Sequence, residues 1–367
     1  MKTVDAIYAA LERTTTHRAH LGASLIGHDC ERASFYAFRW ADTKKIDGRL
    51  ARIFRRGNSE EPEIVSDLTN AGMIVREANP KTGEQYRVST HGGHFGGSLD
   101  ALVQGCPDID DPNETVVAEF KTMNRKNFVN LQKNHCEQSQ PRHFAQMQTY
   151  MHLSFPSNPE RQIKQALYIV VCKDDDEIYS ELIDYDAEVA RSLVEKARRI
   201  IFADDLPPRV AEDETWWQCK FCDFSDVCHT PKLPQPTCRS CIYSKTQNDG
   251  NARWSCQLQD KDLSYDDQIE ACANHVYDPM FMKRWGKMTE TSDKDGWIEY
   301  TMDDGRKFKN GYRSLHVYSS EELHAFNPDL MHDPTVEKLR QEFGAVIEPV
   351  REELDVIVDF FDDEIPF

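Results

Sequence analysis

Eight cysteines in two sets restrict the fold of this 367-residue chain more than any other sequence feature. The first set is formed by Cys30, Cys219, Cys222 and Cys228. The second set is formed by Cys238, Cys241, Cys256 and Cys272. Each set contains a C-x2-C pair, a turn that directs two thiolates at one ion, so each predicts a metal site. By ligand count, four thiolates suit zinc and an iron–sulfur cluster equally.

The composition is that of a folded protein of two or three domains. Hydrophobic residues make up 39% of the chain and aromatic residues 10%. No run approaches about 18 consecutive apolar residues, and charges interrupt the N-terminal apolar pattern. We therefore expect a cytoplasmic protein with no membrane partner, whose cysteines are thiols or metal ligands. The net charge of −19 argues against a uniformly basic nucleic-acid binder, but not against an enzyme that meets DNA through a local groove and metal ions.

The order of helical and strand patterns predicts a layered α/β domain over residues 1–235. Helices are expected within residues 1–20 and over 29–40, 50–68, 143–153 and 187–202. Strands are expected over 73–80, 84–90, 96–104, 115–123, 165–173 and 177–185.

Three smaller units are expected after this domain. Residues 236–285 have few aliphatic side chains and need a metal in place of a core, which favours Zn²⁺ held by the four cysteines of the second set. His275 replacing Cys272, or another iron–sulfur cluster, are the alternatives. Residues 286–354 predict a minor α+β unit with a hairpin turn at Asp304 and Gly305 and a capped helix. Residues 355–367 predict an acidic tail.

Charged residues in two apolar strands indicate a catalytic site. Glu119 and Lys121 are two residues apart on one expected strand, so their side chains share a face, and Asp100 on the preceding strand can meet them there. Two carboxylates beside a lysine suit Mg²⁺ or Mn²⁺ and the hydrolysis of a phosphodiester. The spacing alone is also compatible with a solvated strand face, but the apolar surroundings SLDALV and VVAEFK favour the site.

These residues resemble the signature of the PD-(D/E)XK nucleases, with Leu99 at the position where proline is frequent. Upstream, Arg56-Gly57-x3-Glu61 is similar to an element of lambda-exonuclease-like recombination nucleases. The resemblance implies a restriction-endonuclease-like core, a central mixed sheet flanked by helices. It also implies that Glu61 is a further metal ligand and that the Phe120 carbonyl faces the metal.

A downstream run from His143 to Met151 resembles the Q-x3-Y motif of RecB-type nucleases and the QxQxxM run of the lambda type. The resemblance implies that Gln146 and Tyr150, one helical turn apart, support the lysine, the phosphate or the DNA strand. RecB-type nucleases often place a histidine before the aspartate. Here His91 and His94 precede Asp100. The favoured interpretation is that both histidines stabilise the loop or contact DNA.

The first cysteine set resembles the one-plus-three pattern of AddB-type and CRISPR-associated RecB-like exonucleases. That resemblance implies a [4Fe–4S] cluster on Cys30, Cys219, Cys222 and Cys228, which closes the nuclease domain and has no redox role. In the second module, packing around the metal is favoured over DNA contact for Arg239 and Trp254.

The last residues resemble the C-terminal peptide of bacterial single-stranded-DNA-binding proteins. The run Asp359–Phe367 is acidic and ends in Ile-Pro-Phe. Such a peptide inserts its terminal ring into an apolar pocket while its acids follow a basic rim. The tail would either recruit proteins that recognise single-stranded-DNA-binding-protein tails or occupy the enzyme's own DNA groove.

Together these patterns predict a metal-dependent DNA exonuclease of recombination, repair or phage DNA metabolism. The alternative is a catalytically weak nuclease-fold scaffold that binds repair or replication proteins through its zinc module and tail. The retention of Asp100, Glu119 and Lys121 disfavours that scaffold.

Overall fold

A five-stranded mixed sheet forms the centre of the computed structural model, which describes residues 2–14, 16–43, 45–154 and 162–348. The sheet has the order β10-β9-β8-β7-β4. Its strands are β4 (Ile74–Arg76), β7 (Ala101–Gln104), β8 (Val116–Met123), β9 (Gln165–Cys172) and β10 (Ile178–Asp184). Only β8 and β9 pair in parallel. A parallel pair requires a crossover, and the helices α5 (Arg125–Ser139) and α6 (Pro141–Leu153) lie in it.

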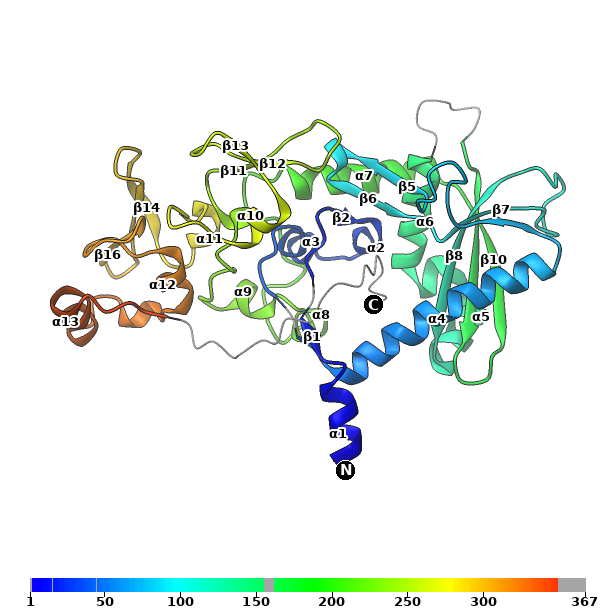
Figure 1. Cartoon of the computed structure of the whole chain (residues 1–367), viewed down its shortest axis with the longest axis horizontal. Coiled ribbons are helices and arrows are strands. Elements are labelled where there is room, and N and C mark those ends of the chain that lie inside the picture. Colours follow the sequence, from blue (N-terminus) through cyan, green and yellow to red (C-terminus); the bar gives the residue numbers. More distant parts are fainter. Residues whose placement is uncertain (1, 15, 44, 155–161, 349–367) are drawn as a thin grey trace.

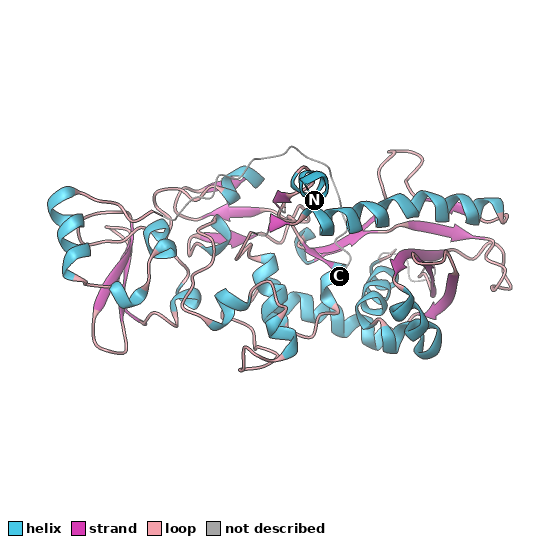
Figure 2. Cartoon of the chain, turned by 90° about the horizontal axis from the view of Figure 1, so that it is seen from below, coloured by secondary structure: helices cyan, strands magenta, loops and turns pink. Residues whose placement is uncertain are grey.

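Helices cover both faces of this sheet. The long α4 (Gly48–Asn70) packs Ile64 and Leu68 on the face that carries Ala118 and Phe120 of β8. The opposite face carries Val117 and Met123 and packs against α5 and α6. Figure 2 shows α4 along one side of the sheet and a group of helices on the other. Apolar residues therefore run almost continuously along β8 because both of its faces are buried.

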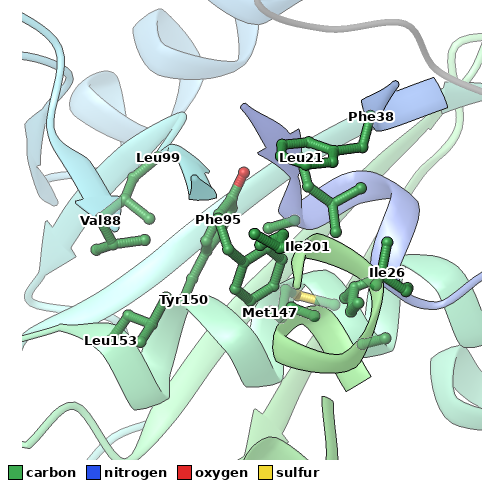
Figure 3. Packing of buried hydrophobic residues seen from close by; sticks show 14 of the residues in the cluster. Leu21, Ile26, Phe38, Val88, Phe95, Leu99, Met147, Tyr150, Leu153 and Ile201 are labelled. Atoms are coloured by element: carbon green, nitrogen blue, oxygen red, sulfur yellow. The ribbon is translucent and has the colours of Figure 1, made fainter. Parts of the chain in front are cut away.

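A second, smaller sheet with the order β2-β6-β5 lies beside α6. Its strands are β2 (Leu21–Gly22), β5 (Arg87–Thr90) and β6 (Phe95–Ser98). The helices packed near it are α2 (Ala23–Ile26), α3 (Glu31–Phe38) and α7 (Ala187–Ile201). Figure 3 shows how Leu21, Phe95 and Met147 from these elements and from α6 share one hydrophobic core. The remaining N-terminal elements are α1 (Lys2–Ala9), β1 (Arg13–Thr14) and β3 (Lys45–Ile46).

The second half of the chain continues away from the sheet, with β14, β16 and α13 at the opposite end of the molecule (Figure 1). Short helices α8 (Trp217–Lys220) and α9 (Ser225–His229) precede a three-stranded sheet of β11 (Ser244–Thr246), β12 (Trp254–Cys256) and β13 (Lys261–Leu263). After α10 (Tyr265–Ile269) and α11 (Pro279–Met282) comes the sheet of β14 (Lys287–Ser292), β15 (Trp297–Thr301) and β16 (Lys307–Gly311). The last helices are α12 (Ser320–Ala325) and α13 (Pro334–Phe343).

The α/β fold class with a central mixed sheet flanked by helices is confirmed. The hairpin is also confirmed, because β15 pairs with β16 and Gly305 has a φ of 88° in its turn. The capping box of Ser319 and Glu322 begins α12 as expected. None of the helices in the described ranges is long and apolar enough to cross a membrane.

The elements differ from the expectation at one strand and one helix. Residues 96–104 form two strands in different sheets, because the chain breaks at Leu99 and Asp100 between β6 and β7. The expected N-terminal helix is present as Lys2–Ala9, and its apolar side chains Val4 and Ile7 are exposed. Helix α5 was not expected, since its sequence is polar and a kink at His135 interrupts its pattern. The tail 355–367 lies outside the described residues.

Candidate active site

Asp100 lies at the point where the chain passes from β6 into β7. The pairing of Ala101 with Ala118 sets Asp100 beside Glu119 on the neighbouring strand. Its Oδ2 accepts a hydrogen bond of 2.7 Å from the backbone N–H of Phe120, and the residue is only 6% exposed. The carboxylate is thus fixed against β8 by the backbone of the strand that carries the other candidate residues.

Glu119 and Lys121 form a buried ion pair on the α6 side of β8. Lys121 Nζ lies 2.6 Å from Glu119 Oε1, and the two side chains are 8% and 0% exposed. Burial strengthens their attraction but also removes both charges from water, so such a pair costs desolvation free energy. With Asp100 beside Glu119 in the strand pairing, the site contains two carboxylates and one ammonium, and this excess of negative charge suits a divalent cation.

Glu61 reaches the same region from α4, on the other face of the sheet. It lines a small cavity of about 20 Å³ together with Phe120 and Lys121. The next residue, Pro62, lies inside α4 and has no N–H to donate to the carbonyl of Asn58. The residue Asn58 also lines this cavity. The structure therefore brings Glu61 next to Phe120 and Lys121.

Gln146 and Tyr150 form a buried pair one turn apart on α6. Gln146 Nε2 donates to the Tyr150 hydroxyl at 3.0 Å, and the residues are 2% and 3% exposed. The hydroxyl lies against Gly97 of β6, where an added Cβ would stand only 2.8 Å from it. Figure 3 shows Tyr150 beside Leu99, the residue before Asp100. Glycine at position 97 thus lets α6 place this pair close to the strand break.

A histidine–tyrosine pair beside these residues was missed in the sequence. Tyr168 of β9 pairs in register with Glu119, and its hydroxyl lies 2.5 Å from Nδ1 of His143 on α6. Burial, with a further contribution from Lys121 and Arg142, lowers the pKa of His143 to about 3. Burial also raises the pKa of Tyr168 well above its usual value. The imidazole is therefore neutral and the phenol protonated, and only the pairing of β8 with β9 could have revealed them.

The lowered pKa of His143 predicts that the stability of the protein depends on pH. Because the pKa of His143 is about 3 in the folded protein and 6.5 otherwise, the unfolded chain takes up the proton first as the pH falls. The unfolding free energy should therefore decrease from pH 6 to pH 4 by about 1.4 kcal/mol per pH unit on account of this residue. Urea unfolding at several pH values should show that the unfolding free energy of His143→Gln decreases less with falling pH than that of the wild type. The exposed His316→Gln should behave as wild type, and equal slopes for all three proteins would contradict the assignment.

The first cysteine set comes together in the structure. All four residues line one cavity of about 20 Å³ near α3, α8 and α9. Burial raises the pKa of the Cys222 thiol, and the neighbouring Cys30, Cys228 and Cys219 contribute in the same direction. The long sequence separation between residue 30 and the other three is therefore bridged by the fold.

The second set is gathered in the same way, around a cavity of about 50 Å³ that all four cysteines line. Burial raises the pKa of Cys238 to about 12, with contributions from Cys241, Cys272 and Cys256. The Cys238 thiol donates to the carbonyl of Asp267 at 3.1 Å. Across the described ranges, however, no group of three or more His, Cys, Asp or Glu side chains is arranged so that it could hold a metal ion.

The three uncertain histidines have packing partners. His91 Nε2 lies 2.9 Å from the carbonyl oxygen of Val194, and the fully buried His94 lies 3.0 Å from that of Gln247. His275 lines the second cysteine cavity, yet its Nε2 lies 2.9 Å from the carbonyl oxygen of Thr237. These contacts agree with roles in loop structure.

The sequence matches the PD-(D/E)XK nuclease superfamily over residues 8–229, more than half of its length. The chain belongs to the PD-(D/E)XK nuclease superfamily. The matched segment contains Asp100, Glu119 and Lys121 as well as all four cysteines of the first set. The match therefore covers the central sheet, α4 and α6. Among curated proteins none matches this sequence.

The solved structures to which the chain shows a likeness include an alkaline exonuclease from Laribacter hongkongensis, also determined in complex with dAMP. It is 17% identical over 53% of this chain and 90% of its own, with a TM-score of 0.34. The protein SSO0001 is 18% identical over 58% of this chain and 88% of its own, also with a TM-score of 0.34.

Proposed function

We propose that this PD-(D/E)XK nuclease is a metal-dependent DNA exonuclease. The observation that carries the proposal is the buried Glu119–Lys121 ion pair beside the fixed Asp100 carboxylate. A buried group of two carboxylates and one ammonium costs free energy that apolar residues would avoid, which supports a catalytic role. A DNA phosphodiester supplies the anionic substrate that an ammonium and a cation would neutralise.

The donor set fits Mg²⁺ or Mn²⁺. Magnesium sites commonly use one or two carboxylates together with substrate phosphate and water, so Asp100 and Glu119 suffice without a preformed cluster of three. Glu61 and the carbonyl of Phe120 would complete the ligands from the α4 side. When bound, the metal would polarise the phosphate and activate a water molecule.

The remaining side chains would act on the substrate or on the lysine. Lys121 would stabilise the negative charge that develops on the phosphate, because its ammonium is fixed beside the carboxylates. Gln146 and Tyr150 would position the strand or the lysine from α6. The neutral His143, next to Arg142, would provide an uncharged hydrogen-bonding group at the same edge of the site.

An assay on end-labelled linear DNA tests the function. We expect single- or double-stranded DNA to be shortened progressively from an end with Mg²⁺ or Mn²⁺, and not with EDTA. Asp100→Asn should lower the rate by about 10²-fold or more, because the amide keeps the shape but loses the charge. A closed circular DNA of the same sequence is the control for endonuclease activity. If pure protein leaves linear DNA intact with either metal, the proposed activity is wrong.

For the cysteines we propose a [4Fe–4S] cluster on the first set and Zn²⁺ on the second. The convergence of each set on one cavity supports metal binding, and cysteine thiolates suit both ions. Deprotonation of the thiols would accompany binding. The cluster would close the nuclease domain 1–235, and the zinc would replace a core in the module 236–285, before the α+β unit 286–354.

The cellular role follows from the substrate and the tail. We propose a cytoplasmic enzyme of DNA recombination, repair or phage DNA metabolism. Residues Asp359–Phe367 would recruit proteins that recognise the tail of single-stranded-DNA-binding protein, since the two peptides share an acidic run ending in Ile-Pro-Phe.

A further inference from the structure

A cationic cavity of about 220 Å³ lies where α3, α9 and α11 approach one another, apart from the nuclease site. None of the candidate catalytic residues lines it. Its cationic lining residues are Arg32, Arg209, Lys232, Lys283 and Arg284. Asp205 is the one acidic residue in the lining. A concentration of positive charge is unexpected in a chain whose net charge is −19.

Carboxylates balance only part of this charge. Lys283 pairs with Asp205, and Lys232 with Asp42 at 3.0 Å. Arg209 pairs at 2.8 Å with Glu212, whose side chain is 86% exposed, so this pair is weak.

The two other guanidiniums bond to backbone carbonyls instead. Arg32 Nε donates to the carbonyl of Pro207 at 2.6 Å, and Arg284 donates to the carbonyl of His229. In the described parts of the chain, neither arginine forms an ion pair with a carboxylate.

The three arginines also lie close enough to repel one another. Partial burial lowers the pKa of Arg284, and the Arg209 and Arg32 guanidiniums lower it further, whereas Cys228 and Tyr36 act in the opposite direction. Like charges gathered in a partly buried space destabilise the folded chain unless an anion joins them. Such a conflict is typical of a binding site rather than of a structural contact.

One buried donor in the wall has no partner in the described structure. The Nε of Arg209 is buried and lacks a hydrogen bond there. Buried donors without acceptors are rare, since each costs about 1–3 kcal/mol in typical proteins. Tyr36, which is 2% exposed, also lines the cavity. An acceptor-rich group in the cavity would satisfy the Arg209 donor.

We propose that this cavity binds a phosphate group carried by a nucleotide or by a nucleic-acid strand. Arg32, Arg209, Arg284 and the Tyr36 hydroxyl offer more donors than the two oxygens of a carboxylate can accept, whereas phosphate presents three oxygens and more charge. Lys232 and Lys283 add two exposed ammonium groups to the lining. The cavity is smaller than a typical ligand pocket of about 300–1,000 Å³, so it suits a phosphate with part of its sugar. Nothing in this proposal depends on nuclease activity.

Binding measurements on the full chain test the proposal. In EDTA and at constant ionic strength, isothermal titration should detect inorganic phosphate, dAMP or a short single-stranded oligonucleotide. Arg284→Gln should weaken binding about tenfold or more, because one charged hydrogen-bond donor is lost. Arg198→Gln, which removes an exposed arginine paired with Glu195, should bind as wild type. Comparable binding of dAMP and oligonucleotide indicates a nucleotide ligand, while much tighter oligonucleotide binding indicates a strand.

A second measurement distinguishes phosphate binding from a role of the arginines in stabilising the neighbouring cysteine site. Tyr36 and Arg209 also line the first cysteine cavity, so the arginines could instead balance the charge of a metal–thiolate group there. If the pocket binds phosphate, Arg284→Gln retains the wild-type iron and zinc content and, without phosphate, melts at the same or a higher temperature. Tyr36→Phe should weaken phosphate binding several-fold with no loss of metal. Loss of metal with unchanged phosphate binding, or no phosphate binding by wild type, would overturn the proposal.

Discussion

Replacing Lys121 by methionine should lower the rate of DNA hydrolysis by about 10²–10³-fold, the usual effect of removing one preorganised charge-stabilising group. The same change should reduce the unfolding free energy by about 3–5 kcal/mol in EDTA, because Glu119 then remains buried without its partner. The two effects have one cause, since the ammonium that would assist the reaction also balances a carboxylate that is 0% exposed.

A double variant separates catalysis from stability. Glu119→Gln combined with Lys121→Met removes both charges, so the double variant should regain much of the lost stability while remaining inactive. Urea unfolding and initial rates on linear DNA measure the two properties. Lys126→Met, which removes an exposed lysine on α5, is the matched control. Full activity of the Lys121 variant would remove it from the catalytic site.

Replacing Cys222 by serine should release the metal that we propose for the first cysteine set and open the nuclease domain at that point. The four cysteines bring residue 30 to residues 219–228, so a metal held by them would close a loop of about 190 residues, and long closures restrict the unfolded chain most. Structural zinc sites contribute about 10–16 kcal/mol in small domains, so loss of one ligand should remove several kcal/mol here.

Anaerobic purification followed by iron and zinc analysis measures the first effect, and thermal unfolding measures the second. The buried Cys106, which lies in the core between α4 and the sheet, provides the control, since Cys106→Ser should keep both metals. A chain that contains zinc but no iron would exclude the iron–sulfur cluster. Unchanged metal content in Cys222→Ser would remove this residue from the ligands.

The sequence predicted most of the nuclease fold because burial leaves a clear periodicity. Both faces of β8 and β9 are covered, so their apolar runs are almost continuous, and the helical pattern of α6 is regular. Helix α5 was missed because it buries only Phe128, Leu131 and Cys136 among polar residues. The break at Asp100 was missed because a strand pattern does not show when its two halves join different sheets.

The sequence alone predicted the candidate catalytic and metal-binding residues, since a Glu-x-Lys pair in an apolar strand and C-x2-C turns are local patterns fixed by spacing. Only the tertiary structure decided which distant groups meet them. The pairing of β8 with β9 sets Tyr168 beside Glu119, and the packing of α6 adds His143. The approach of α3 to α11 likewise gathers three arginines that no sequence pattern connects. Contacts between elements far apart in the chain depend on packing and charge in three dimensions, and the periodicity of hydrophobic residues along the sequence does not reveal them.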